Sequence, residues 1–172
     1  MKKYFLPVFA FAIIFGFTSY SQDLTSVDFT LKDIDGNEQS FQGLLKSFRD
    51  KDGNDKGVTV ISFWAMWCVP CKQELKALIP VYDKLKEKHL RYIAINTDNP
   101  RSTAKVKSYV TAQEFPYIFL LDPNSEVFNK LNGQSMPYSL IVHNNGSLVE
   151  KRVGFLAGDE KEIEKILVKA LE

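Results

Sequence analysis

The 172-residue chain carries 22 Lys and Arg against 21 Asp and Glu, and its formal net charge of +1 gives no electrostatic reason to expect nucleic acid or an acidic membrane surface as a partner. Hydrophobic residues make up 45% and aromatic residues 13% of the chain, which is more apolar surface than a disordered protein carries. The two cysteines exclude a scaffold of several disulfides, so we expect one domain with a hydrophobic core.

Residues 1–21 have the pattern of a secretory signal peptide. Two lysines precede an apolar run over residues 4–17, and the small residues Ser19 and Ser21 then occupy the −3 and −1 positions of a cleavage site. The apolar run is shorter than the ~20 residues that a membrane-spanning helix needs. We therefore predict an exported, periplasmic protein in which residues 22–172 form the mature domain; a retained membrane anchor is the alternative.

The mature chain begins with signals for a β-hairpin. Residues 27–31 alternate as in a half-buried strand, and the Asp-Gly-Asn turn at 35–37 leads into a second extended piece at 38–41. We expect a short helix over 42–50, followed by a polar, glycine-punctuated exposed loop over 50–57.

Strands and helices alternate over the rest of the chain. Apolar, β-branched runs and the strongest hairpin signal, Asn-Gly, predict strands at 58–64, 90–96, 117–121, 138–143 and 148–153. Apolar residues at helical spacing predict helices at 69–88, bent by Pro80, and at 102–113, 125–131 and 159–171. The predicted fold class is therefore α/β: a central mixed sheet flanked by helices, with parallel crossovers, an antiparallel edge and the added hairpin.

Both cysteines lie where a buried strand ends and a helix begins. Unpaired backbone N–H groups and the positive end of the helix dipole favour the thiolate of Cys68. Cys71 lies one helical turn later, where it can resolve a mixed disulfide. Pro70 costs little in the first turn of a helix, and we expect Trp64 and Trp67 to form an apolar, partly exposed platform around the attacking sulfur.

Other uses of the cysteine pair are weaker predictions. A structural disulfide over so short a loop gains little chain entropy. A structural zinc site needs four ligands, and the only histidines, His89 and His143, are not at ligand spacing, so we predict no metal site. A Cu(I) metallochaperone with two thiolate ligands and a domain that only binds a partner remain alternatives.

The segment Trp67-Cys68-Val69-Pro70-Cys71 is similar to the W-C-x-P-C active site of the thioredoxin superfamily. More narrowly, the mature chain resembles the exported TlpA/ResA-like thiol-disulfide oxidoreductases. The other matching pieces are Asp28-Phe29-Thr30-Leu31, Asp35-Gly36, Glu74, Phe115-Pro116 with Leu121-Asp122, and Met136-Pro137 before Leu140-Ile141-Val142. The resemblance implies a thioredoxin-like fold and an enzyme that exchanges its Cys-x-x-Cys pair with protein thiols and disulfides, with no cofactor beyond the redox-active disulfide.

The resemblance also implies roles for residues outside the cysteine motif. It implies a cis bond before Pro137, which puts the backbone of Met136 beside the sulfurs, where a substrate strand docks alongside Trp67. Glu74, one helical turn after the second cysteine, corresponds to the active-site carboxylate, which relays protons to the buried thiol; a solvated surface glutamate is the alternative. Ser62 occupies the position of the buried aspartate of thioredoxin, so that proton relay does not carry over.

The direction of exchange is implied by the resemblance alone. It favours a reductant that is recharged by a membrane electron donor and serves cytochrome c maturation, with a disulfide-forming oxidant as the alternative. Reduction potentials in related folds range from about −270 mV for thioredoxin to about −120 mV for DsbA. A peroxiredoxin-type peroxidase is disfavoured because Ala65 stands three residues before Cys68, where that family has Thr. We expect a monomer with no nucleic-acid partner.

Overall fold

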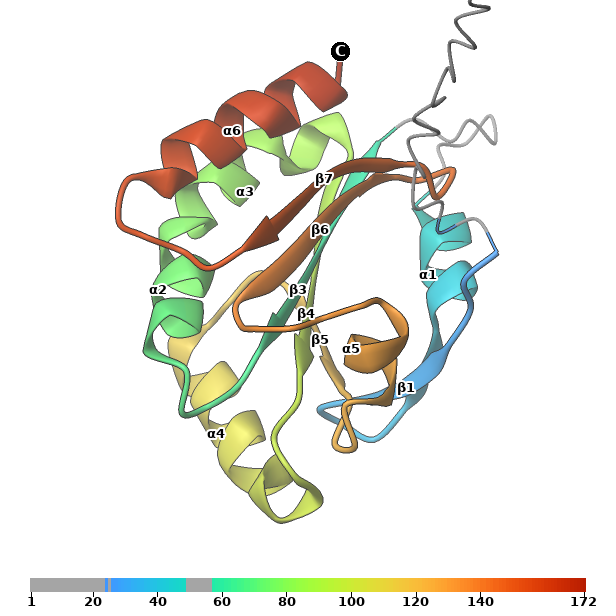
Figure 1. Ribbon diagram of the computed structural model, residues 1–172, viewed down its shortest axis with the longest axis vertical. Helices are drawn as coiled ribbons and strands as arrows, with labels where there is room; N and C mark the ends of the chain where they lie inside the picture. Colours follow the sequence, from blue (N-terminus) through green and yellow to red (C-terminus); the bar gives the residue numbers. More distant parts are fainter. Residues whose placement is uncertain (1–23, 25, 49–56) are drawn as a thin grey trace, which may run out of the picture.

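The computed structural model describes residues 24, 26–48 and 57–172. The described residues contain a seven-stranded sheet with helices on both faces (Figure 1). The strands are β1 (Thr30–Asp33), β2 (Glu38–Ser40), β3 (Val58–Trp64), β4 (Leu90–Asn96), β5 (Ile118–Leu121), β6 (Tyr138–His143) and β7 (Leu148–Val153). The predicted signal peptide and nearly all of the predicted loop at 50–57 lie outside the described residues.

The sheet is mixed, with strand order β2-β1-β5-β4-β3-β6-β7. The pairs β3–β4 and β4–β5 are parallel, whereas β1–β2, β1–β5, β3–β6 and β6–β7 are antiparallel. This arrangement confirms the predicted α/β class, the amino-terminal hairpin and the antiparallel edge. The hairpin extends the sheet because β1 pairs with β5.

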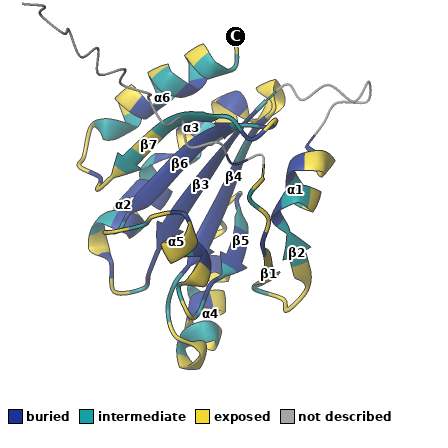
Figure 2. Ribbon diagram, turned by 45° about the vertical axis from the view of Figure 1, so that its right-hand side comes forward, coloured by how far each residue is buried: buried dark blue, intermediate teal, exposed yellow. Residues whose placement is uncertain are grey.

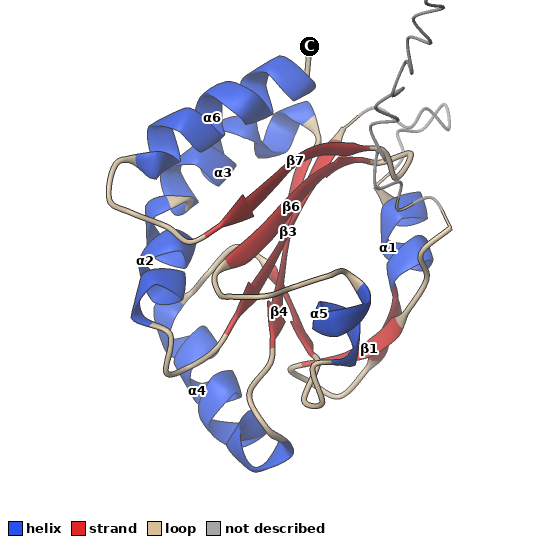
Figure 3. Ribbon diagram, in the orientation of Figure 1, coloured by secondary structure: helices blue, strands red, loops and turns tan. Residues whose placement is uncertain are grey.

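Six α-helices cover the sheet within the described residues (Figure 3). They are α1 (Phe41–Ser47), α2 (Val69–Ala77), α3 (Ile79–Leu85), α4 (Thr103–Gln113), α5 (Glu126–Lys130) and α6 (Asp159–Ala170), with 3-10 turns η1 (Lys86–Lys88) and η2 (Pro100–Ser102). No helix in this part of the chain is long and apolar enough to span a membrane.

The helix predicted over 69–88 is divided rather than bent. The first part, α2, ends at Ala77, and Leu78 is both the C-cap of α2 and the N-cap of α3. The last turn of the predicted helix is the 3-10 segment η1. Pro80 explains the division, because it has no N–H to donate to the carbonyl of Lys76 and its ring crowds that group. The N–H of Leu78, the C-cap residue of α2, donates to the carbonyl of Glu74 at 3.0 Å.

The first strand also differs from its prediction, since it begins at Thr30 and not at residue 27. Asp28 explains the later start. Its side chain accepts hydrogen bonds from the backbone N–H of Phe29 at 2.9 Å and of Gln42 at 3.3 Å, contacts that belong to a loop. Phe29 stacks on Phe41 with ring centroids 4.7 Å apart. The alternating pattern of residues 27–29 therefore reflects the packing of Phe29 in a loop that precedes β1.

Side chains of the central strands alternate between two hydrophobic cores. We call the side covered by α2, α3, α4 and α6 the α2 face, and the side covered by α1 and α5 the α1 face. On β3, Val60 and Trp64 belong to the α2 face, and Ile61 and Phe63 to the α1 face. All seven residues of β3 are buried, as a central strand covered on both sides requires (Figure 2).

Candidate active site

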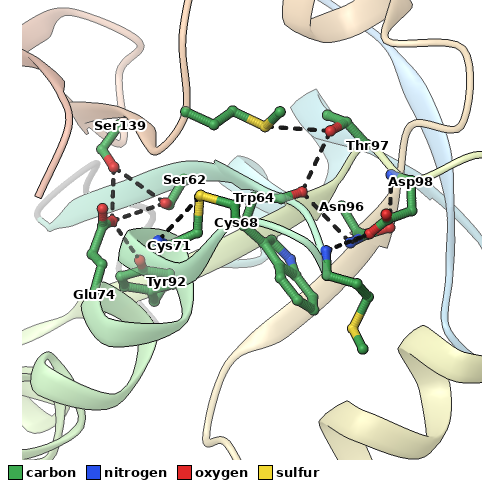
Figure 4. The surroundings of a disulfide bond; sticks show 12 residues. Ser62, Trp64, Cys68, Cys71, Glu74, Tyr92, Asn96, Thr97, Asp98 and Ser139 are labelled. Carbon is green, nitrogen blue, oxygen red and sulfur yellow. Dashed lines mark hydrogen bonds between the residues drawn. A yellow bond between two sulfur atoms is a disulfide. The ribbon is translucent and has the colours of Figure 1, made fainter.

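The two cysteines lie at the amino-terminus of α2, directly after the loop that follows β3 (Figure 4). They form a disulfide with Cα atoms 5.3 Å apart. Cys68 is the N-cap residue, and its Sγ accepts a hydrogen bond from the backbone N–H of Cys71 at 3.2 Å. Pro70 occupies the first turn, where its missing N–H has no helical partner to lose. This is the strand-to-helix setting that the sequence predicts.

The sulfurs are nearly covered, while their neighbours in the chain are exposed. Cys68 is 4% exposed and Cys71 1%, whereas Trp67 is 70% and Val69 60% exposed. The predicted platform of two tryptophans is wrong for Trp64, which is fully buried. The side chain of Trp64 lies on the α2 face of the sheet, where it packs against the rings of Tyr109 and Phe119.

Asp98, which the sequence analysis did not single out, holds the loop before the cysteines. Its Oδ2 accepts the backbone N–H of Met66 at 2.6 Å and the Nδ2–H of Asn96 at 2.8 Å. The backbone N–H of Thr97 donates to the carbonyl of Trp64 at 3.0 Å. The end of β4 therefore fixes the loop between β3 and α2 through contacts between segments far apart in the chain.

The Met136–Pro137 peptide bond is cis, as the resemblance implies. Pro137 is buried and directly precedes β6, and its carbonyl accepts the N–H of Gly154 at 2.8 Å. The hydroxyl of Thr97 donates to the Sδ of Met136 at 3.3 Å. The backbone N–H of Thr97 also donates to the carbonyl of Trp64. Thr97 therefore contacts both the Met136–Pro137 segment and the end of β3, from which the loop before the cysteines starts.

Glu74 is buried, with 2% of its surface exposed, so the solvated alternative for this residue is wrong. Its Oε1 accepts three hydroxyl hydrogen bonds: from Ser62 at 2.8 Å, from Ser139 at 2.8 Å and from Tyr92 at 3.0 Å (Figure 4). The Oγ atoms of Ser62 and Ser139 are 3.1 Å apart. We call Ser62, Tyr92 and Ser139 the hydroxyl cluster.

Burial raises the pKa of Glu74 above its ordinary value, because a charged carboxylate loses its hydration inside the protein. The hydrogen bonds from Ser139, Ser62 and Tyr92 and the charge of Arg152 act in the opposite direction. Burial also raises the pKa of Tyr92 well above its ordinary value, so its hydroxyl stays protonated and remains a donor.

Sequence reasoning found Glu74 but none of its three hydroxyl partners. Ser62 was noted only as a departure from thioredoxin, and Tyr92 and Ser139 gave no local signal. Only the strand register of the structure brings Ser139 to this position, directly opposite Ser62 in the β3–β6 pair. Across the described residues, no group of three or more His, Cys, Asp or Glu side chains is placed to hold a metal ion.

Comparison with known proteins gives one family and several relatives. The chain matches the AhpC/TSA family over residues 25–165. It is 28% identical over 127 residues to the thiol-disulfide oxidoreductase ResA of a Bacillus cereus strain, a match that covers 74% of this chain and 66% of that protein, just under two thirds of its length. It is 22% identical over 121 residues to the sporulation thiol-disulfide oxidoreductase A of Bacillus subtilis, covering 68% of this chain and 73% of the relative.

Solved structures share the fold. A candidate DsbE thiol:disulfide interchange protein of Chlorobium tepidum superposes with a TM-score of 0.73 at 23% identity, covering 88% of this chain and 97% of the other. An uncharacterised thioredoxin-like protein of Porphyromonas gingivalis gives a TM-score of 0.66 at 30% identity, and the match covers 83% of this chain and 88% of the other. These matches confirm the thioredoxin-like fold that the cysteine motif implied.

Proposed function

This chain belongs to the AhpC/TSA family, and from that premise we propose that it is a thiol-disulfide oxidoreductase acting on protein thiols and disulfides. The observation that carries the proposal is the Cys68–Cys71 disulfide at the amino-terminus of α2, with an exposed tryptophan immediately before it. A disulfide that closes so short a loop adds little stability, so its position favours exchange over a structural role. The names of the ResA relatives support the same activity.

The proposed reaction begins from the reduced pair. The Cys68 thiolate, stabilised by the helix N-terminus, attacks one sulfur of a partner disulfide. The partner S–S bond breaks, a Cys68–partner bond forms, and the other partner sulfur leaves as a thiolate. Cys71 then attacks Sγ of Cys68, which releases the second partner sulfur. The partner gains two electrons from the cysteine pair, its two thiolates take up protons from solvent, and the enzyme is left with its disulfide.

Glu74 is the proposed proton acceptor in the second step. Cys71 must lose its proton before it attacks, and it is 1% exposed, so bulk water has little access to it. Glu74 lies three residues further along α2, on the same side of the helix as Cys71. A carboxyl whose pKa is raised by burial holds a proton more readily than a solvated one, which suits it to this exchange.

We propose that substrates dock across Trp67, Met136 and Pro137. Trp67 supplies an exposed apolar surface next to the reactive pair. Pro137 stands at the start of β6, and Met136 is half-buried beside Thr97, which borders the loop before the cysteines. An extended partner segment could then pair with the Met136 backbone while its side chains contact the indole.

The assignment of the two cysteines is tested by trapping. A C71S variant is incubated with a small disulfide-bonded peptide and analysed by mass spectrometry without reductant. We expect a mixed disulfide on Cys68 that persists, because the resolving thiol is absent. The matched C68S variant should form little adduct, since Cys71 is the more buried of the pair and Cys68, not Cys71, caps the amino-terminus of α2. Equal adducts on both variants would contradict the assignment.

We extend the proposal to an exported reductant that a membrane electron donor recharges and that serves cytochrome c maturation. Its support is the signal-like pattern of residues 1–21 and the resemblance to TlpA/ResA-like proteins. The mass of the protein recovered from the cell envelope tests the export step. We expect a chain that begins after Ser21, and an intact amino-terminus in the cytoplasmic fraction would contradict it.

A further inference from the structure

The hydroxyl cluster draws one carboxylate oxygen into contact with three adjacent strands. Ser62 lies on β3, Tyr92 on β4 and Ser139 on β6, and these strands are neighbours in the order β4-β3-β6. All three hydroxyls reach the same atom, Oε1 of Glu74, from the side of the α2 face. The cysteine-bearing helix is therefore attached to the centre of the sheet by this carboxylate.

The donors of the cluster match an ionised carboxylate. A hydroxyl carries one proton to donate, so three hydroxyls can supply three hydrogen bonds to Oε1 when Glu74 is charged. When Glu74 is protonated it becomes a donor, and a serine hydroxyl can rotate to accept from it. The 3.1 Å separation of the Ser62 and Ser139 oxygens lets one serine donate to the other in that state. Rotation of hydroxyls thus satisfies both protonation states.

Few other charges act on Glu74. The positive charge of Arg152 on β7 favours the charged form of Glu74, and its guanidinium also pairs with Glu162 at 3.3 Å and Glu150 at 3.7 Å. Tyr117, ahead of β5, donates its hydroxyl to the carbonyl of Leu75 at 3.0 Å. On α2 itself, Cys71 lies one turn before Glu74 as half of the disulfide, and the helix also carries two lysines, Lys72 and Lys76. The hydroxyl cluster is thus the main polar environment of this carboxylate in the part of the chain that the structure describes.

We propose that Ser62, Tyr92 and Ser139 are positioning residues that hold the Glu74 carboxylate at the sheet, one helical turn after Cys71, and set the pH range over which the active-site pair exchanges its proton. This inference rests on the proposed function and deepens it. In the reducing reaction Glu74 takes the proton of Cys71 before the Cys71 thiolate attacks Cys68, and later returns that proton to solvent. Loss of a hydroxyl removes a donor that favours the charged carboxylate, so Glu74 holds its proton to higher pH.

The test is the pH dependence of the midpoint of the Cys68–Cys71 pair in a dithiothreitol series, read by thiol labelling. We compare wild type with S62A, S139A, Y92F and E74Q. Each hydroxyl variant should move the inflection upward by about half to one pH unit, the equivalent of one hydrogen bond. E74Q should abolish this inflection.

Two further variants separate positioning from a structural effect. T59V removes another buried hydroxyl of β3, which donates to Oδ1 of Asn144 at 3.0 Å and not to Glu74, so its inflection should match wild type. The double variant S139A/E74Q should show the same pH dependence as E74Q alone, with no inflection to move. An upward shift for T59V, or no shift for the cluster variants in a protein that still exchanges disulfides, would overturn the inference. A wild-type pair that fails to exchange at all would instead overturn the proposed function.

Discussion

The two faces of the sheet are built from the same strands but bury different chemistry. The α1 face is filled by aromatic and aliphatic side chains, with Phe63 packed against Phe128 and Tyr138. The α2 face has the larger apolar core, and it also buries the disulfide and Glu74, whose carboxylate is bonded to three hydroxyls. The buried carboxylate on the other side, Asp122, instead accepts the backbone N–H groups of Glu126 and Phe128 at the start of α5. Ser62 and Phe63, adjacent in β3, show how one strand supports the fold on one side and the site on the other.

The largest expected effect comes from the α1 face. Phe63 is fully buried, so F63A should lower the free energy of unfolding by about 3 to 5 kcal/mol through lost contacts and a cavity. The redox inflection of the cysteine pair should stay at its wild-type pH, because Phe63 points away from Glu74. Urea unfolding measures the free energy of unfolding, and the thiol-labelling titration measures the redox inflection. S62A is the matched variant, and it should shift the redox inflection. A shifted inflection in F63A would mean that the faces are not separable.

The next effect concerns the charge on the α2 face. The raised pKa of Glu74 means that the folded protein keeps a proton which the unfolded chain loses above its ordinary pKa of 4.5. Stability should therefore fall as pH rises from about 4.5 until the folded-state pKa is passed, with a limiting slope of about 1.4 kcal/mol per pH unit. E74Q should lose this part of the pH dependence. Urea titrations of wild type and E74Q at several pH values over that range measure this difference. The same pH dependence of stability in both proteins would contradict a raised pKa of Glu74 in the folded state.

A smaller effect is expected from the loop before the cysteines. D98A leaves the backbone N–H of Met66 without its acceptor, which should cost about 1 to 2 kcal/mol. The rate of disulfide reduction by dithiothreitol should change as well, because the loop positions Cys68. Asn99 is the matched control, since its side chain caps the turn at Arg101. An unchanged reduction rate in D98A, equal to that of N99A, would limit Asp98 to a role in stability.

The smallest effect is expected at the outer helices. Lys84 on α3 pairs with Glu164 on α6, but the side chain of Lys84 is 66% exposed. K84A should change stability by less than about 1 kcal/mol, as is typical of exposed ion pairs, and should leave the redox titration unchanged. A double-mutant cycle with E164A measures the coupling. A coupling energy well above about 1 kcal/mol would contradict this expectation and show that the ion pair between α3 and α6 contributes substantially to stability.

Local sequence signals were enough for most of the fold. The strands at 58–64, 90–96, 138–143 and 148–153 have the predicted bounds, because apolar runs and the Asn-Gly turn are encoded within a few residues. The same holds for the cysteine pair, whose motif and helix N-terminus are contiguous. The cis bond before Pro137 came from the resemblance and not from local chemistry.

Long-range contacts account for what the sequence did not predict. Tyr92 and Ser139 reach Glu74 only after three strands align in register, and no local pattern specifies that register. Asp98 contacts a residue 32 positions away in the chain. Trp64 was expected at the surface from its nearness to the cysteines, yet strand alternation directs it into the α2 core. The site is therefore predictable as a motif, while its supporting contacts require the fold.

The central proposal is that Cys68 and Cys71 form a redox pair that acts as a reductant. The most direct measurement equilibrates the purified wild-type protein with a series of dithiothreitol or glutathione redox buffers at neutral pH and counts free thiols by labelling. We predict one two-electron transition that involves both cysteines, with a midpoint closer to that of thioredoxin, about −270 mV, than to that of DsbA, about −120 mV. A midpoint near the DsbA value would make the protein an oxidant, and a pair that does not exchange with either buffer would contradict the redox function itself.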